Sequence, residues 1–518
     1  MLNRYLRQQG IVDQQALSQL RVLVSGSANG IADVLVLLDQ LGVSSTNGTI
    51  GIHSEETSNP DSVFWCLAFD DSPSFEALSR RLPDKYTIVD EIESTSEWDI
   101  HLSIDGSLEL PNTIYARTNG PRALISMDPI VDAIENQPNH PLTPSIRVAC
   151  CSALIERMLR VLGLTNRLIV SDAWTTATYR IETTDLQLAN AVIQAKGVEH
   201  AAVNFQPSSD GLATLARIRL PYDSQRNLHD YLSIEKESFD RQADADVGLV
   251  PWDDTKSSLN QLFNIDEKNI VVLGAGGLGS WCAPLMLQML PSGEVHIVDS
   301  DEQVEQHNLN RQVLYNEQHI GLAKAIVAQE RLSRINPNLH IHGYVEHLLP
   351  GHINQELLND EEEFEADDLD DNLESELSAA LQSSSLYFAC LDNMKARTLL
   401  NEAALLNDAD FVNGGSESVH GIVERMSNEE GCMVCRYGKE TANEVEVVSC
   451  TEEGVRPIAS IATTTAWAGA IMAAIGLVQS SQLNELALPR FQWHKGSVQR
   501  TVTGSKPPWM NEPCLRHI

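Results

Sequence analysis

The chain has 518 residues, with 72 Asp and Glu against 36 Lys and Arg, which gives a formal net charge of −36 at pH 7. This excess of acidic residues excludes nucleic acid and an anionic membrane surface as main partners, because both require basic patches on the protein. The length allows two to four domains with large buried cores.

The N-terminal segment, "MLNRYLRQQG", does not contain the apolar core of a signal peptide. The nine cysteines are too few for a disulfide framework in a chain of this length. We therefore expect a cytoplasmic protein with reduced thiols.

A first β-α-β pattern follows this segment. An apolar run with a worn glycine turn, "VLVSGSANGI", occupies residues 22–31, and a helical pattern, "IADVLVLLDQLG", and a second strand, "GTIGIHS", come after it. Residues 165–247 then include "TYRIETTDLQLANAVIQAKGVEHAAVNF" and "LATLARIRLPY", which favour a small mixed α/β module.

A second β-α-β pattern begins at Lys268. A buried strand is followed by the turn "GAGGLG", an apolar helix over residues 280–290 and a strand, "GEVHIVDS", with Asp299 at its end. The order matches the first pattern, with His53 at the place of Asp299. The two units therefore look like copies, one intact and one eroded.

The intact turn carries Gly274, Gly276 and Gly279 in G-x-G-x-x-G spacing. Such glycines let the backbone approach a phosphate and direct the helix N-terminus toward it. Alone, the motif is more typical of a dinucleotide dehydrogenase. Asp299 fits a ribose contact in either class.

The residues that follow the turn separate the two classes. The segment "VDSDEQVEQHNLNRQVLYNEQHIGLAKAIVAQERLSRINP" and the later "FACLDNMKARTLLN" resemble the activating enzymes of ubiquitin-like proteins and their sulfur-carrier relatives, the ThiF group. The resemblance covers residues 268–480. It implies that ATP is surrounded by Asp299, Asn308, Arg311, Gln312, Lys324, Asp392 and Asn393.

The chemistry of acyl adenylate formation requires the same residue types. A carboxylate attacks the α-phosphate while pyrophosphate leaves, so negative charge must be neutralised at both ends. Arg311 and Lys324 supply fixed positive charge, and Asp392 is suited to hold the Mg²⁺ that bridges the phosphates. Taken singly, each of these side chains is also compatible with an ordinary surface ion pair.

The resemblance also accounts for the eroded copy. Members of this group work as dimers or fused pseudo-dimers, in which one half supplies an arginine to the ATP site of the other. The corresponding "RYLRQ" motif, with Arg7, stands before the eroded copy, whereas only "FDRQ" at residues 239–242 stands before the intact one. We therefore expect an inactive N-terminal half that contributes Arg7 and an active C-terminal half that binds ATP.

Two further segments allow alternative interpretations. Residues 360–371, "DEEEFEADDLDD", hold nine acidic residues in twelve, as expected of a solvated loop or insert, or of a partner-binding segment. Residues 457–478 carry no charge over 22 residues, which is long enough to span a bilayer. Their Thr and Ala content favours a helix buried in a large α/β domain.

Six of the nine cysteines fall into three groups. Cys432 and Cys435 have C-x-x-C spacing, which suits a redox pair or, with Cys514 and His517, a structural Zn²⁺ site. Cys282 and Cys390 lie in apolar segments and are expected to be inert core residues.

Cys450 forms the third group and precedes the long uncharged stretch. The resemblance implies that it carries thioester or persulfide chemistry, and a following helix N-terminus would stabilise its thiolate. A structural cysteine in a loop is the alternative.

Together these features predict an α/β protein with two Rossmann-like adenylation domains in an intramolecular pseudo-dimer. The expected ranges are 1–164 for the inactive domain, 165–247 for the small module and 248–518 for the active domain. The predicted function is ATP-dependent adenylation of the C-terminal glycine of a ubiquitin-like protein, thioester formation on Cys450 and transfer to a conjugating enzyme. Sulfur-carrier or peptide adenylation and a non-catalytic scaffold are the alternatives.

Overall fold

The structure is a computed structural model of the chain. It describes residues 4–8, 11–70, 72–92, 97–110, 113–131, 137, 139–164, 174–181, 183–188, 202–207, 214–221, 244–254, 257, 267–353, 375–391, 393–426, 431–438, 460–478, 490–494 and 497–500.

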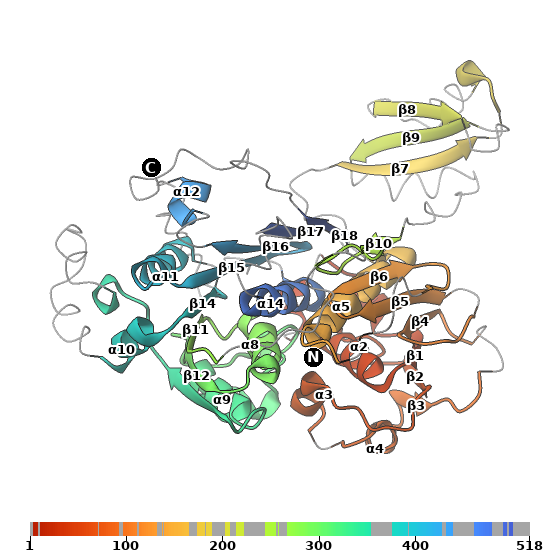
Figure 1. The fold of residues 1–518 in the computed structure, drawn as a ribbon. Coiled ribbons are helices and arrows are strands. Elements are labelled where there is room, and N and C mark those ends of the chain that lie inside the picture. The colour runs from red at the N-terminus through yellow and green to blue at the C-terminus, as the bar shows by residue number, and fades with distance from the viewer. Residues whose placement is uncertain are drawn as a thin grey trace.

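The N-terminal half is built on a seven-stranded sheet with the order β10-β6-β5-β4-β1-β2-β3 (Figure 1). Its five strands from β5 to β3 are parallel, while β6 and β10 pair antiparallel. The strands are β1 (Arg21–Gly26), β2 (Thr49–Ser54), β3 (Tyr86–Ile88), β4 (Ile100–Ile104), β5 (Thr113–Asn119), β6 (Arg122–Ser126) and β10 (Ala245–Asp246). The helices are η1 (Leu6–Gln8), α1 (Gln14–Leu17), α2 (Ala28–Leu41), α3 (Val63–Ala68), α4 (Phe75–Arg81) and α5 (Thr143–Val161).

The C-terminal half is built on an eight-stranded sheet with the order β13-β12-β11-β14-β15-β16-β17-β18. The first five strands are parallel and the last three antiparallel. The strands are β11 (Ile270–Leu273), β12 (Gly293–Val298), β13 (Leu339–Tyr344), β14 (Leu386–Ala389), β15 (Asp410–Glu417), β16 (His420–Met426), β17 (Arg490–His494) and β18 (Ser497–Arg500). The helices are α8 (Gly279–Met289), η4 (Gln306–Asn308), η5 (Glu317–His319), α9 (Lys324–Leu332), η6 (Pro350–His352), α10 (Glu376–Ser383), α11 (Met394–Leu406), α12 (Met433–Tyr437) and α14 (Ala462–Leu477).

The two sheets repeat one topology, as the sequence predicted. In each, the first strand lies between the second and the fourth, and the fifth strand is followed by an antiparallel extension. One detail of the predicted alignment is wrong. Gly26 pairs with Ser54, whereas Leu273 pairs with Val298, so the residue equivalent to Asp299 is Ser54 and His53 lies one position earlier.

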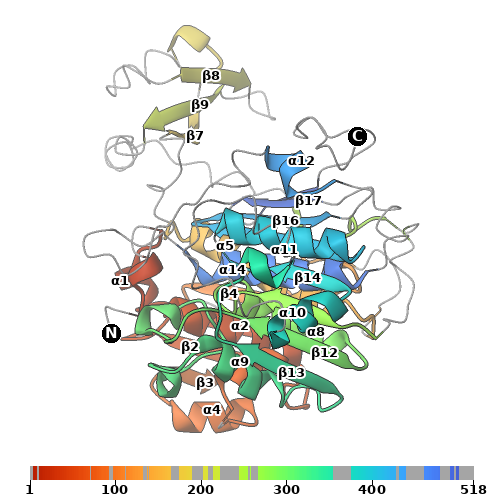
Figure 2. The same cartoon turned by 90° about the vertical axis from the view of Figure 1, so that its left-hand side faces the viewer.

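A third sheet lies between the two halves in the sequence. It has the order β7-β9-β8 and is antiparallel throughout, with strands β7 (Trp174–Ile181), β8 (Ala202–Pro207) and β9 (Thr214–Pro221). Both views of the ribbon show it standing away from the two large sheets (Figures 1 and 2). Its assignment as a separate module over residues 165–247 stays a prediction.

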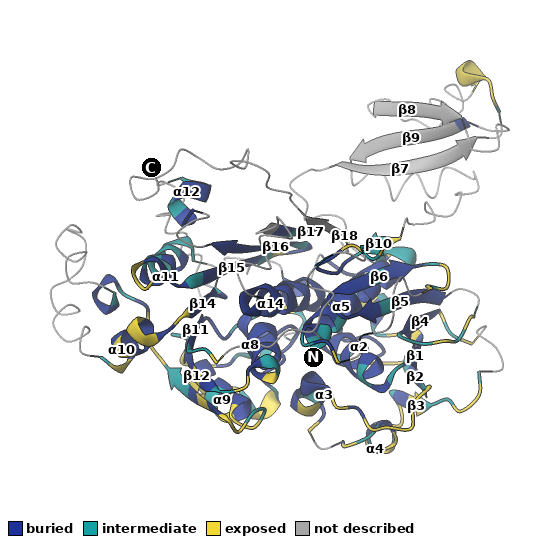
Figure 3. Cartoon of the chain, viewed as in Figure 1, coloured by how far each residue is buried: buried dark blue, intermediate teal, exposed yellow. Residues whose placement is uncertain are grey.

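Helix α14 lies within the uncharged stretch of residues 457–478, whose length would be enough to span a bilayer. All sixteen of its residues are buried, so the expectation of a helix inside an α/β domain is confirmed (Figure 3). In the part of the chain that the structure describes, no helix is long and apolar enough to cross a membrane.

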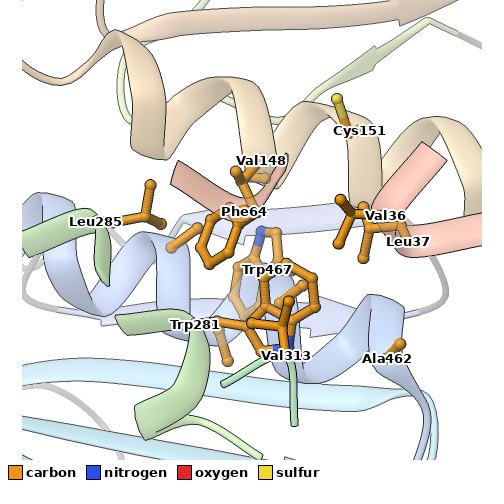
Figure 4. Close-up of a cluster of buried hydrophobic side chains, with 14 of the residues drawn as sticks. Val36, Leu37, Phe64, Val148, Cys151, Trp281, Leu285, Val313, Ala462 and Trp467 are labelled. Atoms are coloured by element: carbon orange, nitrogen blue, oxygen red, sulfur yellow. The ribbon is translucent and has the colours of Figure 1, made fainter. Parts of the chain in front are cut away.

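Helix α14 packs on α5 and α2 of the first half and on α8 of its own half. One continuous core therefore contains side chains from both halves, including Val148, Phe64, Trp281 and Trp467 (Figure 4). The rings of Phe64 and Trp281 have centroids 4.6 Å apart. Such an aromatic pair contributes about 0.5–1.5 kcal/mol beyond its buried area.

Candidate functional site

The glycine turn joins β11 to α8, and two of its glycines are required by the protein itself. Gly274 has a φ of +97°, a region that disfavours side chains, and an added Cβ would lie 2.8 Å from the carbonyl oxygen of Cys390. A Cβ on Gly279 would lie 2.0 Å from the oxygen of Gly274. These two residues make the sharp turn possible.

Gly276 differs from these two glycines. Among the described residues, the nearest atom to a Cβ at this position is Nε2 of Gln312, at 3.6 Å, so these residues leave room there for a side chain. Neither packing nor a positive φ explains a glycine at this position. Close approach of a ligand such as a phosphate to the backbone would explain it.

Asp299 and Tyr315 tie the turn to its surroundings. Asp299 accepts hydrogen bonds from the backbone N–H of Ala275 at 2.7 Å and of Asp301 at 2.9 Å. Burial raises the pKa of Asp299, an effect that Lys324 partly opposes. The hydroxyl of Tyr315 donates to the carbonyl of Ala275 at 2.8 Å, and this bond holds the turn from the other side.

The two predicted cations of this half lie beside the turn. Lys324, the first residue of α9, is buried and forms an ion pair with Asp301. Arg311 is also buried, and its Nε lies 3.7 Å from the position that a Cβ on Gly277 would take. Its Nη1 donates to the carbonyl oxygen of His307 and to the side chain of Asn310, both at 3.0 Å.

The first half contributes Arg7 to the same place. Nη2 of Arg7 lies 3.3 Å from Nε2 of His307, and its backbone carbonyl accepts a hydrogen bond from the N–H of Ser460 at 2.9 Å. The neighbouring Gln8 accepts a bond from Asn310 at 3.2 Å. The "RYLRQ" segment is thus anchored on the second half at two adjacent residues.

The electrostatic effect of this arrangement is visible at His307. The pKa of His307 is lowered to about 4 by burial first, and then by the positive charges of Arg7, Arg311 and Lys324. The three cations are therefore close enough to act on one imidazole. A cluster of three buried cations next to a glycine turn is suited to bind a polyanion.

Unpaired donors provide a test of whether a nucleotide fits. Nδ2 of Asn308 and Nε of Arg7 are buried, and neither has a hydrogen-bond partner among the described residues. A buried donor without an acceptor costs about 1–3 kcal/mol. Ligand oxygens would satisfy both donors, so the residues present fit a triphosphate.

The equivalent turn in the first half is filled by the protein itself. Ala28 lies two residues after Gly26, as Gly276 lies two residues after Gly274, and its backbone N–H donates to a carboxylate oxygen of Glu56 at 3.0 Å. Ser27 caps α2 by accepting from the N–H of Gly30. An acidic side chain thus occupies the end of α2 where a phosphate would bind.

Two more predicted site residues, Asn393 and Gln312, are described in the structure. Four others lie outside the described residues. Asn393 accepts a hydrogen bond from the N–H of Ala396 and is the N-cap of α11. Gln312 is buried, with its Nε2 near Gly276. Asp392, Cys450, Cys514 and His517 lie outside the described residues.

The C-x-x-C pair is brought together at the start of α12. Cys432 and Cys435 are buried, and their sulfur atoms are 3.7 Å apart. Two thiolates on one tetrahedral zinc, with bonds of about 2.3 Å, would be about 3.8 Å apart. Within the described residues, no group of three or more His, Cys, Asp or Glu side chains is arranged to hold a metal ion. The inert core role predicted for Cys282 and Cys390 agrees with their burial.

Sequence reasoning missed four residues of the site. His307 and Asp301 stand within the motif that carried the resemblance, but neither was given a role. Tyr315 gave no signal beyond an aromatic residue in the same segment. Trp281 also donates from Nε1 to the carbonyl of Arg311 at 2.8 Å, and so connects the core between the halves to the site.

Comparisons with known proteins show what this part of the chain is similar to. Residues 255–506 match the model of the ThiF family. The second half of the chain is therefore a ThiF-family domain.

Three relatives align with about two fifths of this chain. They are "Adenylyltransferase and sulfurtransferase UBA4" of Candida albicans, 28% identical over 38% of this chain and 40% of the relative; "Sulfur carrier protein adenylyltransferase" of Thermus thermophilus, 31% identical over 37% and 63%; and "Ubiquitin-like modifier-activating enzyme 5" of Dictyostelium discoideum, 28% identical over 40% and 51%. The alignments thus span less than two thirds of each relative.

The two turns lead to a prediction about nucleotide binding. Titration calorimetry with ATP and Mg²⁺ should show one site per chain, because Glu56 fills the turn of the first half. Lys324→Ala should weaken this binding roughly tenfold or more, since it removes a buried charge from the second half. A second equivalent of ATP, or unchanged binding by Lys324→Ala, would contradict the assignment.

Proposed function

We propose that the C-terminal half uses ATP to adenylate the terminal carboxylate of a ubiquitin-like protein. The convergence of Arg7, Arg311 and Lys324 beside the glycine turn carries this proposal. The relatives support it, because their names include adenylyltransferases and an activating enzyme for a ubiquitin-like modifier.

In this reaction the carboxylate oxygen forms a bond to the α-phosphorus, and the bond to the leaving pyrophosphate breaks. Negative charge increases on the pyrophosphate, and fixed cations stabilise it without having to reorganise. Arg7, Arg311 and Lys324 supply that charge. Backbone N–H groups of the turn at Gly276 and Gly279 approach the phosphates, whereas the N–H of Gly274 donates to the carbonyl of Val298 at 2.7 Å and this glycine serves the sharp turn itself.

The remaining predicted residues bind other parts of the nucleotide. Asp299 contacts the ribose hydroxyls, and Asn308, Gln312 and Asn393 supply further hydrogen bonds. Asp392 would hold Mg²⁺, which would supply positive charge that neutralises part of the phosphate charge.

We further propose that the two halves form an intramolecular pseudo-dimer with one working site. The shared topology, the packing of α5 on α14 and the filled turn at Glu56 support an inactive first half. Its contribution to the reaction is Arg7.

After adenylation, we propose that the thiolate of Cys450 attacks the activated carbonyl and releases AMP. The resulting thioester keeps the acyl group transferable to a conjugating enzyme. Sulfur-carrier activation without such a cascade is the second candidate, since two of the three relatives are named for sulfur chemistry. A non-catalytic scaffold is disfavoured by the three cations at the second turn.

We propose a structural Zn²⁺ at Cys432, Cys435, Cys514 and His517. The distance of 3.7 Å between the first two sulfur atoms supports thiolates that share one metal ion. The metal would tie the C-terminal segment to α12.

Arg7→Ala should lower ATP–pyrophosphate exchange about tenfold or more, because it removes a charge that stabilises the transition state. The assay uses a ubiquitin-like protein that supports exchange by the unaltered enzyme. Arg4→Ala is the matched control, since Arg4 belongs to the same segment but pairs with Asp39. Equal exchange by Arg7→Ala and Arg4→Ala would refute the shared site. Asp392→Ala should abolish exchange.

From the proposed zinc site we expect about one zinc per chain, which elemental analysis would measure. Deletion of residues 514–518 should release the metal and lower the melting temperature, because metal binding and folding are coupled. Cys66→Ser, at an exposed cysteine, should retain the metal. Protein that contains no zinc would instead favour a redox pair.

Cys450→Ala should preserve pyrophosphate exchange while eliminating the thiol-sensitive adduct that a non-reducing gel shows with ATP and the ubiquitin-like protein. The adenylation residues remain intact in this variant, whereas the nucleophile is lost. Cys66→Ala should keep the adduct. An adduct that persists in Cys450→Ala would show that Cys450 is not the nucleophile. An unaltered enzyme that adenylates without ever forming an adduct would favour the second candidate.

A further inference from the structure

His307 lies between the two arginines of the site and contacts both. Its backbone oxygen accepts from Nη1 of Arg311 at 3.0 Å, and its Nε2 is 3.3 Å from Nη2 of Arg7. We propose that His307 is a positioning residue whose imidazole holds Arg7 of the first half beside Arg311. This inference rests on the proposed nucleotide site.

The direction of the hydrogen bond fixes the state of the imidazole. A guanidinium has donors only, so Arg7 donates and Nε2 of His307 accepts. Nε2 must then be unprotonated, which places the proton of the neutral ring on Nδ1. This tautomer is a consequence of the geometry that can be observed directly.

A second group competes for the same nitrogen. Oε2 of Glu305 lies 3.5 Å from Nε2 of His307. If Nε2 were protonated, it would donate to Glu305 and repel Arg7. The imidazole can therefore hold Arg7 only while it is neutral.

The charges around His307 keep it neutral. Arg7, Arg311 and Lys324 face the ring as cations, and Asp301 and Glu305 are the nearby anions. Burial and the three cations lower its pKa to about 4. The ring thus remains an acceptor at neutral pH, and the contact with Arg7 is lost only as the pH falls toward 4.

The same facts argue against His307 as a general base. Its Nε2 is already engaged by Arg7, and a pKa of about 4 makes it a weak base at neutral pH. A role in orienting Arg7 accounts for both observations. It also explains how a flexible side chain from a segment some 300 residues away is kept in one geometry.

ATP itself is the probe, so the first test requires no protein partner. His307→Leu should weaken ATP binding about as much as Arg7→Ala, roughly fivefold to tenfold. His307→Gln should stay within about threefold of the unaltered protein, because its Oε1 still accepts from Arg7. The double variant Arg7→Ala/His307→Leu should bind no more weakly than Arg7→Ala alone. His340→Leu, at an exposed position of β13, is the control and should bind normally.

The second test observes the imidazole by NMR of the protein with labelled histidine. The signal that is absent in His307→Gln identifies His307. It should report the Nδ1–H tautomer and remain neutral down to about pH 5.5. In Arg7→Ala its pKa should rise toward the usual value of about 6.5, because one neighbouring cation is gone.

Different outcomes overturn different claims. If Arg7→Ala weakens ATP binding but His307→Leu does not, or if the ring carries its proton on Nε2, the positioning role is wrong. If the unaltered protein does not bind ATP, the proposed adenylation fails instead. In that case the NMR titration still decides whether His307 holds Arg7.

Discussion

Helix α14 has no polar face, so every side of this helix must be covered by other parts of the protein. Its sixteen residues are buried on every side. A single sheet can cover only one side of such a helix, and the sheet of its own half does so through β15 and β16. The opposite side needs a second apolar surface, which α5 and α2 of the first half provide. Burial of this much apolar area is the dominant favourable contribution to the association of the two halves.

This constraint gives a structural role to a first half that is inactive, as proposed above, because its apolar surface still covers α14. Its contribution to the core, for example Phe64 against Trp281, does not depend on the turn. The turn itself is stable without a ligand, because Glu56 supplies the negative charge that the end of α2 favours. The half thus covers α14 and places Arg7 beside His307.

The core and the candidate site are also joined by specific bonds. Trp281, which packs against Phe64, donates to the carbonyl of Arg311. Ser460, two residues before α14 begins, donates to the carbonyl of Arg7. The two arginines are therefore both fixed by residues of the interface. A substitution that loosens the interface would displace both arginines even from a position that contacts neither of them.

Much of the fold was predictable because it depends on local patterns. The glycines, the apolar runs and the uncharged stretch indicated two repeated α/β units and a buried helix, and the structure confirms both. The equivalence of His53 and Asp299 failed because it matched the two segments at their ends, "HS" and "DS", whereas the strand pairing makes Ser54 the equivalent residue. Neither the hydrogen bond from Ala28 to Glu56 nor the contact of Arg7 with His307 can be predicted from a sequence pattern, because both are set by tertiary packing.

The net charge of the chain makes the contact between Arg7 and His307 more important. A protein with a net charge of −36 repels ATP at long range, but salt screens such repulsion over about 8 Å under physiological conditions. Binding of ATP at the proposed site would therefore depend on charges in direct contact with the nucleotide. Two of the three cations, Arg311 and Lys324, belong to the half with the intact turn. Each is already partly engaged: Arg311 by Asn310, and Lys324 by Asp301.

Arg7 has no ion pair with a carboxylate among the described residues, and its main partner is an uncharged imidazole. Its full positive charge remains available for a phosphate, which is why a neutral acceptor at position 307 suits the site better than an acidic one.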